Sequence, residues 1–445
     1  MGNQNPFHLG WFTGNGVGMY GWNVPFGQAD GREFFKPDFW RDIARMLDRA
    51  CFDLFIWEDS SYIPNNYGGT HDIYLKNGIF TPKHDPAPYV PLLAEATEHI
   101  GIALTIPTSE YPPYLAARLL NTLDHLSDGR VAWNIVTGSN HLSAMNYGHE
   151  GHLEHDERYA VADEYVDLVS RLFGSWDADA VVMDKATGTV TDPTKVRPID
   201  YEGRYLRSRG PLNSMPSPQH RPVYIQAGGS NAGRDFAAKH AEVIINNDWS
   251  VPVMKSFVDD IHARMAKFGR KPSDVKILFM LNPLIAETQE DADVAYEAMK
   301  DAAYRVDPAL RLAQMSAKAG IDFSQFDLDA PLPELQTNGH QATLANFLRG
   351  GGVGIDRSKT LRELVQTSGR ANSSLDIIGT PDAVAAQMGD VMAEVGGDGY
   401  LISSPRVTRR YVTEVVDGLV PALQRQGLSR TGFAGTTLRD SLMEF

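Results

Sequence analysis

The chain has 445 residues, of which 42% are hydrophobic, and this composition is typical of a soluble protein with a large buried core. Its 41 basic and 56 acidic residues give a formal net charge of −15, which argues against binding to nucleic acid or to anionic membranes. The single cysteine excludes an intrachain disulfide, and no apolar run is long enough to cross a membrane, so we expect a cytoplasmic protein.

Short apolar runs alternate along the chain with longer segments of helical period, which is the pattern of parallel strands joined by helices. We expect eight strands, at residues 7–12, 52–57, 101–106, 131–136, 223–226, 242–245, 275–280 and 399–402. A helix after the third strand is expected to bury Leu115, Leu119, Leu123 and Leu126, and further helices are expected at 34–49, 90–98, 157–173, 231–240, 251–267, 289–304, 381–394 and 407–425. Eight such units favour an α/β fold of one domain over residues 1–445, a (β/α)8 TIM barrel.

Two stretches interrupt this alternation. Residues 176–221, after the fourth unit, are rich in Pro, Gly and Asp, and we expect an insertion that covers the barrel surface. Residues 305–374, between the seventh strand and the last unit, form a second irregular insertion with a glycine-rich run at 350–354. Because this stretch is too long for an ordinary connection, we expect it to cover the active site.

A TIM barrel carries its active site in the loops that follow the C-terminal ends of the strands. Aromatic, amide and hydroxyl side chains occupy such positions at residues 11–13, 57–59, 105–109, 134–137 and 226–230. The turn Gly228-Gly229-Ser230 leads into a predicted helix, so its backbone amides and the Ser230 hydroxyl are a candidate phosphate site. A plain turn in which Ser230 caps the helix is the alternative.

Three other patterns resemble known motifs without meeting their requirements. The glycines at 16, 18 and 21 match a dinucleotide-binding fingerprint, but no helical pattern follows them, which favours an aromatic loop over the pocket. Residues 149–155 hold three histidines at a spacing unsuited to zinc, so we expect no metal; polar contacts to a ligand from His155, Arg158 and Tyr159 are favoured over a solvated loop. Glu58 and Asp59 are a poor glycosidase pair, because adjacent strand residues point to opposite faces.

The segment Leu123-Asp-His-Leu-Ser-Asp-Gly-Arg-Val-Ala-Trp-Asn-Ile-Val-Thr137 closely resembles the fourth-strand region of bacterial-luciferase-like flavin monooxygenases. Within that family, the chain resembles the branch of nitrilotriacetate, EDTA and dibenzothiophene-sulfone monooxygenases. The pieces that carry this resemblance extend over most of the chain: Tyr111-Pro-Pro-Tyr114, 152–159, 184–188, 209–212, 222–228 and 436–442.

The resemblance implies the oxygenase component of a two-component monooxygenase, which takes FMNH2 from a separate NAD(P)H:FMN reductase and uses O2 to oxygenate a small organic substrate. It also implies a homodimer or homotetramer. The flavin ring and ribityl chain would contact Asp59, Thr105, Asn134, His155 and Tyr159, and Arg158 and Ser230 would lie near the phosphate. Thr137, Gly228 and Gly229 complete the expected cofactor site. His155, Tyr159 and Asp59 are the catalytic candidates, which could stabilise the activated oxygen or manage its proton.

The expected substrate pocket differs from that of the sulfone-oxidising relatives, which look aromatic where this chain has Ile56 and Ile245. We expect the pocket to be lined by Trp11, Phe12, Tyr20, Ile56, Trp57, Ile245 and Trp249. This lining favours a hydrophobic, aromatic or heteroatom-containing xenobiotic, and the lack of a Lys/Arg cluster at the strand ends disfavours a polycarboxylate. Two alternatives remain, a deazaflavin-dependent hydride-transfer enzyme and a flavin-binding protein without catalysis, with a glycosidase as a distant third.

Overall fold

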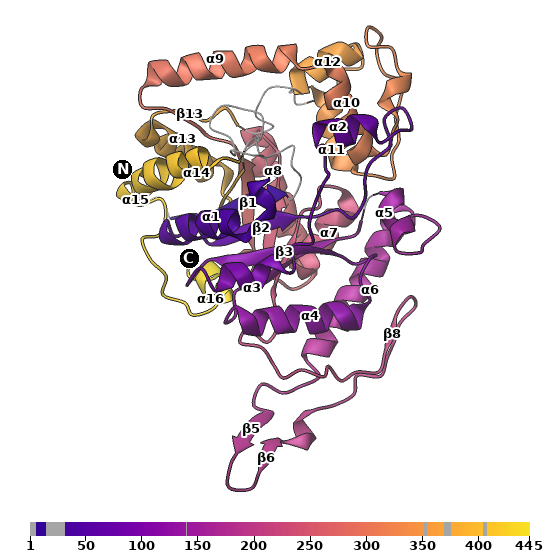
Figure 1. The fold of residues 1–445 in the computed structure, drawn as a ribbon, viewed down its shortest axis with the longest axis vertical. Helices are drawn as coiled ribbons and strands as arrows, with labels where there is room; N and C mark the ends of the chain where they lie inside the picture. The colour runs from indigo at the N-terminus through magenta and orange to yellow at the C-terminus, as the bar shows by residue number, and fades with distance from the viewer. Residues whose placement is uncertain (1–5, 15–31, 139, 351–353, 369–374, 404–406) are drawn as a thin grey trace.

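The protein is represented by a computed structural model, which describes residues 6–14, 32–138, 140–350, 354–368, 375–403 and 407–445 (Figure 1). Eight parallel strands close into a barrel in the order β1-β14-β11-β10-β9-β4-β3-β2. The strands are β1 (His8–Gly14), β2 (Leu54–Glu58), β3 (Gly101–Pro107), β4 (Val131–Val136), β9 (Val223–Gln226), β10 (Val243–Asn246), β11 (Lys276–Leu281) and β14 (Gly399–Ile402). The predicted (β/α)8 barrel is therefore confirmed, with every strand close to its predicted bounds.

Helices surround the barrel and bury their apolar faces against it. They are α1 (Pro37–Arg49), α3 (Tyr89–Ala94), α4 (Pro113–Leu126), α6 (His155–Phe173), α7 (Asn231–His240), α8 (Val251–Lys267), α13 (Pro381–Val395), and a last helix formed by α14 (Arg409–Thr413), a π-helical turn (Glu414–Leu419) and α15 (Val420–Arg425). A further helix, α9 (Gln289–Arg305), is largely exposed. Three short helices were not predicted: α2 (Asp72–Asn77), α5 (His141–Asn146) and α16 (Leu438–Leu442). None of the helices that the structure describes is long and apolar enough to cross a membrane.

The predicted inner face of α4 was wrong in part. Leu115 and Leu126 are 49% and 58% exposed, whereas Ala116, Leu120 and Leu123 are buried. A prediction from the leucine spacing alone overlooks the alanines, whose small side chains allow a helix to approach the barrel closely.

Side chains of the barrel strands alternate between the interior and the outer face that meets the helices. The interior cluster consists of small and branched residues, among them Ile56, Ala103, Ile225 and Ile245, with Phe12 packed against it. Trp11 and Trp57, at 0% and 1% exposure, belong instead to the outer core. Trp11 lies against Phe52 and Tyr411, and Trp57 lies against Trp40 and Phe55. The prediction that Trp11 and Trp57 line the substrate pocket was therefore wrong, because they point away from the barrel interior.

The first insertion contains two antiparallel hairpins, β5 (Val181–Asp184) with β6 (Thr189–Thr191) and β7 (Tyr201–Glu202) with β8 (Arg207–Ser208). The hairpin β5-β6 projects away from the barrel (Figure 1), and Val182, Met183 and Val190 on it are exposed. This hairpin therefore does not cover the barrel surface as expected.

The second insertion is more helical than its sequence predicted. It contains α10 (Pro308–Ala319), α11 (Gln341–Arg349) and α12 (Leu361–Ser368), which pack around a small apolar cluster of their own. Helix α2, which follows β2, lies among these helices (Figure 1), and its Tyr74 packs against Ala313 and Ala317 of α10. A two-stranded sheet of β12 (Leu284–Ile285) and β13 (Ile378–Gly379) joins the segments on either side of the insertion.

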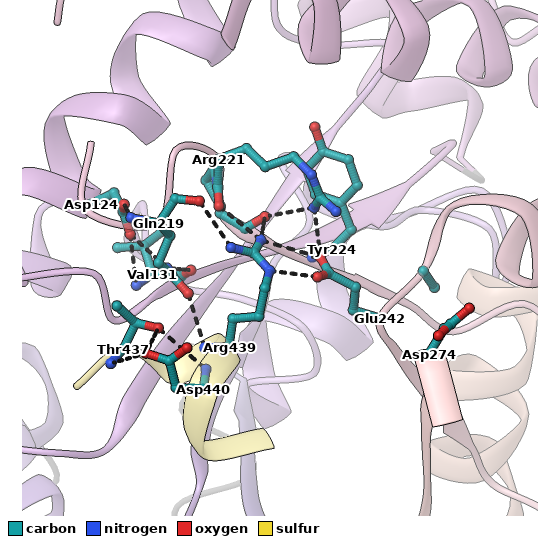
Figure 2. Close-up of polar contacts among 12 residues, drawn as sticks. Asp124, Val131, Gln219, Arg221, Tyr224, Glu242, Asp274, Thr437, Arg439 and Asp440 are labelled. Atoms are coloured by element: carbon teal, nitrogen blue, oxygen red, sulfur yellow. Dashed lines mark hydrogen bonds and ion pairs between the residues drawn. The ribbon is translucent and has the colours of Figure 1, made fainter. Parts of the chain in front are cut away.

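The C-terminal segment closes the N-terminal end of the barrel. Leu438 and Leu442 of α16 enter the interior cluster. Arg439 donates to Oε1 of Glu242 at 2.6 Å and to the carbonyl oxygen of Gln219 at 2.9 Å (Figure 2). Burial opposes the ionisation of Glu242, but the charges of Arg221 and Arg439 outweigh it and lower the pKa of this carboxyl. The last residues of the chain therefore fasten α16 to the loops before β9 and β10.

We predict that Arg439→Ala destabilises the fold, because it leaves Glu242 with one arginine and removes several carbonyl contacts. Loss of a partner from such a buried network lowers the free energy of unfolding by about 2–3 kcal/mol. For a chain of this size, this corresponds to a fall in melting temperature of roughly 3 °C. Differential scanning calorimetry measures this change. Arg41→Ala, which breaks an ion pair with the 82%-exposed Asp38, is the control and should leave the melting temperature within about 1 °C. Equal melting temperatures of the two variants would contradict the prediction.

Candidate active site

Two polar side chains from neighbouring strands meet inside the C-terminal mouth of the barrel. Thr105 of β3 donates its hydroxyl to the carbonyl oxygen of Trp57 at 2.6 Å, and Asn134 of β4 donates its amide to the Thr105 hydroxyl at 2.8 Å. Both side chains are buried, yet Oδ1 of Asn134 has no hydrogen-bond partner among the described residues. A buried acceptor without a partner is costly, so Oδ1 of Asn134 is available to accept a hydrogen bond from a ligand.

The turn after β9 forms a cradle at the N-terminus of α7. Ser230 caps the helix by accepting a hydrogen bond from the Gly233 amide at 3.1 Å. A Cβ atom on Gly228 would lie 2.7 Å from the Gln226 amide group, and one on Gly229 would lie 2.8 Å from Cβ of Ala342. The backbone can therefore run this close to its neighbours only with glycine at both positions, and its amides lie at the positive end of the helix dipole.

Tyr159 of α6 reaches the same cradle. Its hydroxyl is 2.8 Å from the position that a Cβ atom on Gly233 would take. Burial raises the pKa of Tyr159, although hydrogen bonding with Ser230 and Gln226 opposes the rise. The phenol is therefore protonated at neutral pH, and a hydroxyl donor joins the backbone amides and the Ser230 hydroxyl. Such a set of donors suits a phosphate group.

His155 and Arg158 lie one helical turn apart at the start of α6, and both are engaged by protein groups. Nδ1 of His155 is 2.7 Å from Oδ1 of Asp156, and its ring centroid is 5.2 Å from that of Tyr159. Arg158 is buried and donates to the carbonyl oxygens of Gly138 and Asn338. Arg158 thus joins the loop after β4 to the second insertion.

Two carboxylates and a lysine occupy the end of β2. Nζ of Lys83 is 2.8 Å from Oε2 of Glu58 and 2.7 Å from the Ser60 hydroxyl, and its side chain is only 8% exposed. Burial raises the pKa of Asp59 to about 7, although the charge of Lys83 opposes the rise. Asp59 can therefore accept or release a proton near neutral pH, as a general acid or base must.

The second insertion lies against three loops at this end of the barrel. The carbonyl oxygen of Ala317, in α10, accepts from the Tyr62 hydroxyl at 3.5 Å and from the Asn140 amide at 3.4 Å. Ala342, in α11, approaches Gly229 as described above. The insertion therefore contacts the loops that follow β2, β4 and β9.

The structure brings most of the expected site residues together. The expected cofactor residues at the ends of β3, β4 and β9 gather with Tyr159 around the mouth, and Phe12, Ile56 and Ile245 belong to the barrel interior below it. Trp11 and Trp57 lie outside the barrel, as noted above. Tyr20 and most of the aromatic first loop lie outside the described residues, and Trp249 is half-buried in the loop after β10.

Other residues at the mouth escaped the sequence analysis. Gln226, at the end of β9, lies in the stretch 226–230 that the sequence marked but was not assigned to the cofactor, and its buried Oε1 also has no partner among the described residues. Lys83 and Lys318 are far from any strand end in the sequence, so nothing in the pattern marked them. In the described ranges, no group of three His, Cys, Asp or Glu side chains converges as ligands of a metal.

Comparison with known proteins agrees with this geometry. The model of the luciferase-like monooxygenases matches residues 14–399. The chain belongs to the luciferase-like monooxygenase family. It is 35% identical to dibenzothiophene-sulfone monooxygenase of Rhodococcus erythropolis (strain XP), over 99% of this chain and 97% of the relative. It is 34% identical to nitrilotriacetate monooxygenase component A of Aminobacter aminovorans, again over 99% and 97% of the two chains.

Solved structures of the family share the fold as well. A riboflavin lyase, crystallised with a modified FMN and its substrate riboflavin, has a TM-score of 0.89 and 29% identity over 99% of this chain and 96% of that chain. The predicted membership of the luciferase-like family is confirmed, and the chain is a monooxygenase.

We predict that Asp59→Asn raises the melting temperature relative to the unmodified chain at pH 8 more than at pH 5. The folded-state pKa of Asp59, about 7, lies above the ordinary value of 3.8, so folding is penalised increasingly as pH rises from 4 to 7. Asparagine does not ionise and escapes this penalty. The gain in melting temperature of the variant over the unmodified chain should be roughly 2 °C larger at pH 8 than at pH 5 by scanning calorimetry. A difference of zero would mean that the carboxyl is already ionised at pH 5.

Proposed function

We propose that the chain is the oxygenase component of a two-component monooxygenase, which uses FMNH2 from a separate NAD(P)H:FMN reductase and O2 to oxygenate a small organic substrate. The observation that carries this proposal is the combination of a phosphate cradle with partnerless buried amide oxygens at the mouth of a barrel of the luciferase-like family. The riboflavin lyase with its modified FMN is consistent with a flavin in this place.

The residues at the mouth fit FMN. The amides of Gly228 and Gly229, the Ser230 hydroxyl and the Tyr159 hydroxyl would hold the phosphate, with Thr137 beside them. The backbone amides of Gly228 and Gly229 have no partner in the part of the chain that the structure describes, which leaves them available for this role. Asn134 and Thr105 would hold the polar edge of the flavin, where the partnerless Oδ1 of Asn134 can accept an N–H group.

When bound, reduced FMN supplies the electrons that activate O2. The chain's own residues would then exclude water, orient the substrate and handle protons. Asp59 could hold or release a proton at its carboxyl group near pH 7, and His155 and Tyr159 are the other candidates for this role. The second insertion, which contacts the loops after β2, β4 and β9, would cover the mouth and keep bulk water out.

The substrate would lie on the apolar floor of the mouth. Phe12, Ile56, Ile245 and Met280 form this floor, which suits the apolar part of a small, heteroatom-containing organic molecule. Dibenzothiophene sulfone is an uncharged aromatic compound and nitrilotriacetate is a tricarboxylate, so the names of the relatives do not decide the substrate class. We also propose that the protein works in the cytoplasm, where NAD(P)H is available, as a homodimer or homotetramer.

A turnover experiment tests the reaction class. The purified chain, an FMN reductase, NADH and ¹⁸O2 are incubated with a panel of organosulfur, aromatic and carboxylate compounds, with riboflavin included. We expect one ¹⁸O atom in a product, detected by mass spectrometry, and His155→Ala should lower its yield per NADH consumed. NADH consumption that yields only hydrogen peroxide across the panel would instead indicate flavin binding without catalysis, and activity only with a reduced deazaflavin would indicate hydride transfer.

The cradle generates a separate binding prediction. Ser230→Ala should weaken FMN binding about tenfold, which corresponds to about 1.4 kcal/mol, and should leave riboflavin binding unchanged, since riboflavin lacks the phosphate. Quenching of flavin fluorescence measures both dissociation constants. Thr437→Ala, which removes the equivalent cap of α16 at the opposite end of the barrel, is the matched control and should not affect either ligand. An equal loss of FMN and riboflavin binding would contradict the assignment of the turn to the phosphate.

A further inference from the structure

The second insertion brings a lysine, Lys318, to the mouth of the barrel. Lys318 is the penultimate residue of α10 and follows Ala317, whose carbonyl oxygen accepts hydrogen bonds from Tyr62 and Asn140. The carbonyl oxygen of Lys318 itself accepts from the backbone amide of His340 at 3.0 Å. The backbone of Lys318 is therefore held between two barrel loops and the segment that precedes α11.

Lys318 shares an aromatic ring with Lys83. Nζ of Lys318 lies 5.9 Å from the centroid of the Phe80 ring, and Nζ of Lys83 lies 5.8 Å from the same centroid. Phe80 has a φ of 59°, a left-handed conformation that bulky residues rarely adopt. The surrounding structure thus maintains an unfavourable backbone conformation at the residue whose ring lies beside both ammonium groups, as is common at ligand sites.

The two lysines differ in their partners. Lys83 is neutralised by Glu58, as described above. Lys318 forms no ion pair with any residue that the structure describes, and its side chain is accessible to solvent although protein atoms surround it. Desolvation and the charge of Lys83 lower the pKa of Lys318, whereas the charge of Glu58 raises it. A negative group beside Lys318 would favour its charged form, and the attraction would be stronger here than in bulk water.

The neighbouring titratable groups His340 and Asp59 do not neutralise the positive charge of Lys318. Desolvation and the charges of Lys318 and Arg158 lower the pKa of His340 to about 4, so its imidazole is neutral at pH 7. The pKa of Asp59, at about 7, means that this carboxyl is only partly ionised there. In its protonated form Lys318 is therefore a positive charge without an ion-pair partner among the described residues, in a chain whose formal net charge is −15. Such a local field attracts and orients an anion.

Two anions could lie near this charge, the FMN phosphate and a negative group of the substrate. The phosphate cradle belongs to the turn between β9 and α7, whereas the charges that act on Lys318 are those of Glu58 and Lys83 at the end of β2. We infer that Lys318 binds a carboxylate or another anionic group of the substrate, and that the Phe80 ring packs against the adjoining apolar part. This inference rests on the proposed function, and it adds an anionic group to the hydrophobic, aromatic or heteroatom-containing substrate that the sequence favoured.

A matched pair of probes tests the anion site. (Phenylthio)acetate and the uncharged (phenylthio)acetamide are titrated calorimetrically into the chain, both with and without bound FMN. The unmodified chain should bind the acid about tenfold more tightly than the amide. Lys318→Met should weaken binding of the acid about tenfold and change binding of the amide less than twofold, whereas Lys318→Arg should retain the preference. Lys267→Met, which removes an exposed lysine of α8, is the control.

Four results would decide the matter. Equal binding of acid and amide by the unmodified chain would overturn the inference, as would unchanged binding of the acid by Lys318→Met at an unchanged melting temperature. If Lys318→Met weakened binding of FMN but not of riboflavin, Lys318 would belong to the cofactor phosphate, which also overturns it. If the chain bound no flavin, yet Lys318 still governed binding of the acid, the anion site would stand while the proposed oxygenase function would fail.

Discussion

Closure of the eight strands into a barrel imposes the constraint on which the rest of the structure depends. Because successive side chains of a strand point in opposite directions, each strand divides its residues between a packed interior and a shell that meets the helices. Phe12 and Ile56 lie inside, whereas their neighbours Trp11 and Trp57 lie outside. The interior below the mouth is filled with apolar side chains, so polar groups concentrate at the C-terminal ends of the strands, where Thr105 and Asn134 meet.

The two ends of the barrel serve different purposes. At the N-terminal end, Arg439 and Glu242 hold the C-terminal helix in place, and Gln219 connects this network to Asp124 (Figure 2). Asp124 is the second residue of the family motif of residues 123–137, and Gly129 and Val131 of the same motif accept hydrogen bonds from Leu438 and Gln219, so the first part of the motif helps to close the barrel. Only its last part, with Asn134 and Thr137, reaches the mouth. The motif that most clearly indicates the family is thus largely structural. Every enzyme built on this barrel has to cover the N-terminal end of the barrel interior, and the first part of the motif does so.

At the C-terminal end, the insertions and loops determine the chemistry. The end of α10 rests on Tyr62 and Asn140, and this contact places Lys318 close to the ring of Phe80 and to the pair formed by Lys83 and Glu58. The two lysines of this charged rim, Lys83 and Lys318, are more than two hundred residues apart in the sequence. Substrate preference in such a design can change through the insertion while the flavin cradle stays the same.

The sequence by itself determined the barrel, its eight strands and the family, because alternation of apolar runs with helical periods is a local property that neighbouring residues specify. It also located the Gly228-Gly229-Ser230 turn and Asn134, since the turn comes shortly after a strand and Asn134 lies in the C-terminal half of one. The side of the barrel to which Trp11 and Trp57 point was not decided in this way, because an aromatic residue near a strand end suits either face until the strand register is known. No sequence pattern marked Lys83 or Lys318 as residues of the mouth. Only the tertiary structure places them at one ring, since the insertion that carries Lys318 reaches the mouth through contacts with distant loops that no local pattern encodes.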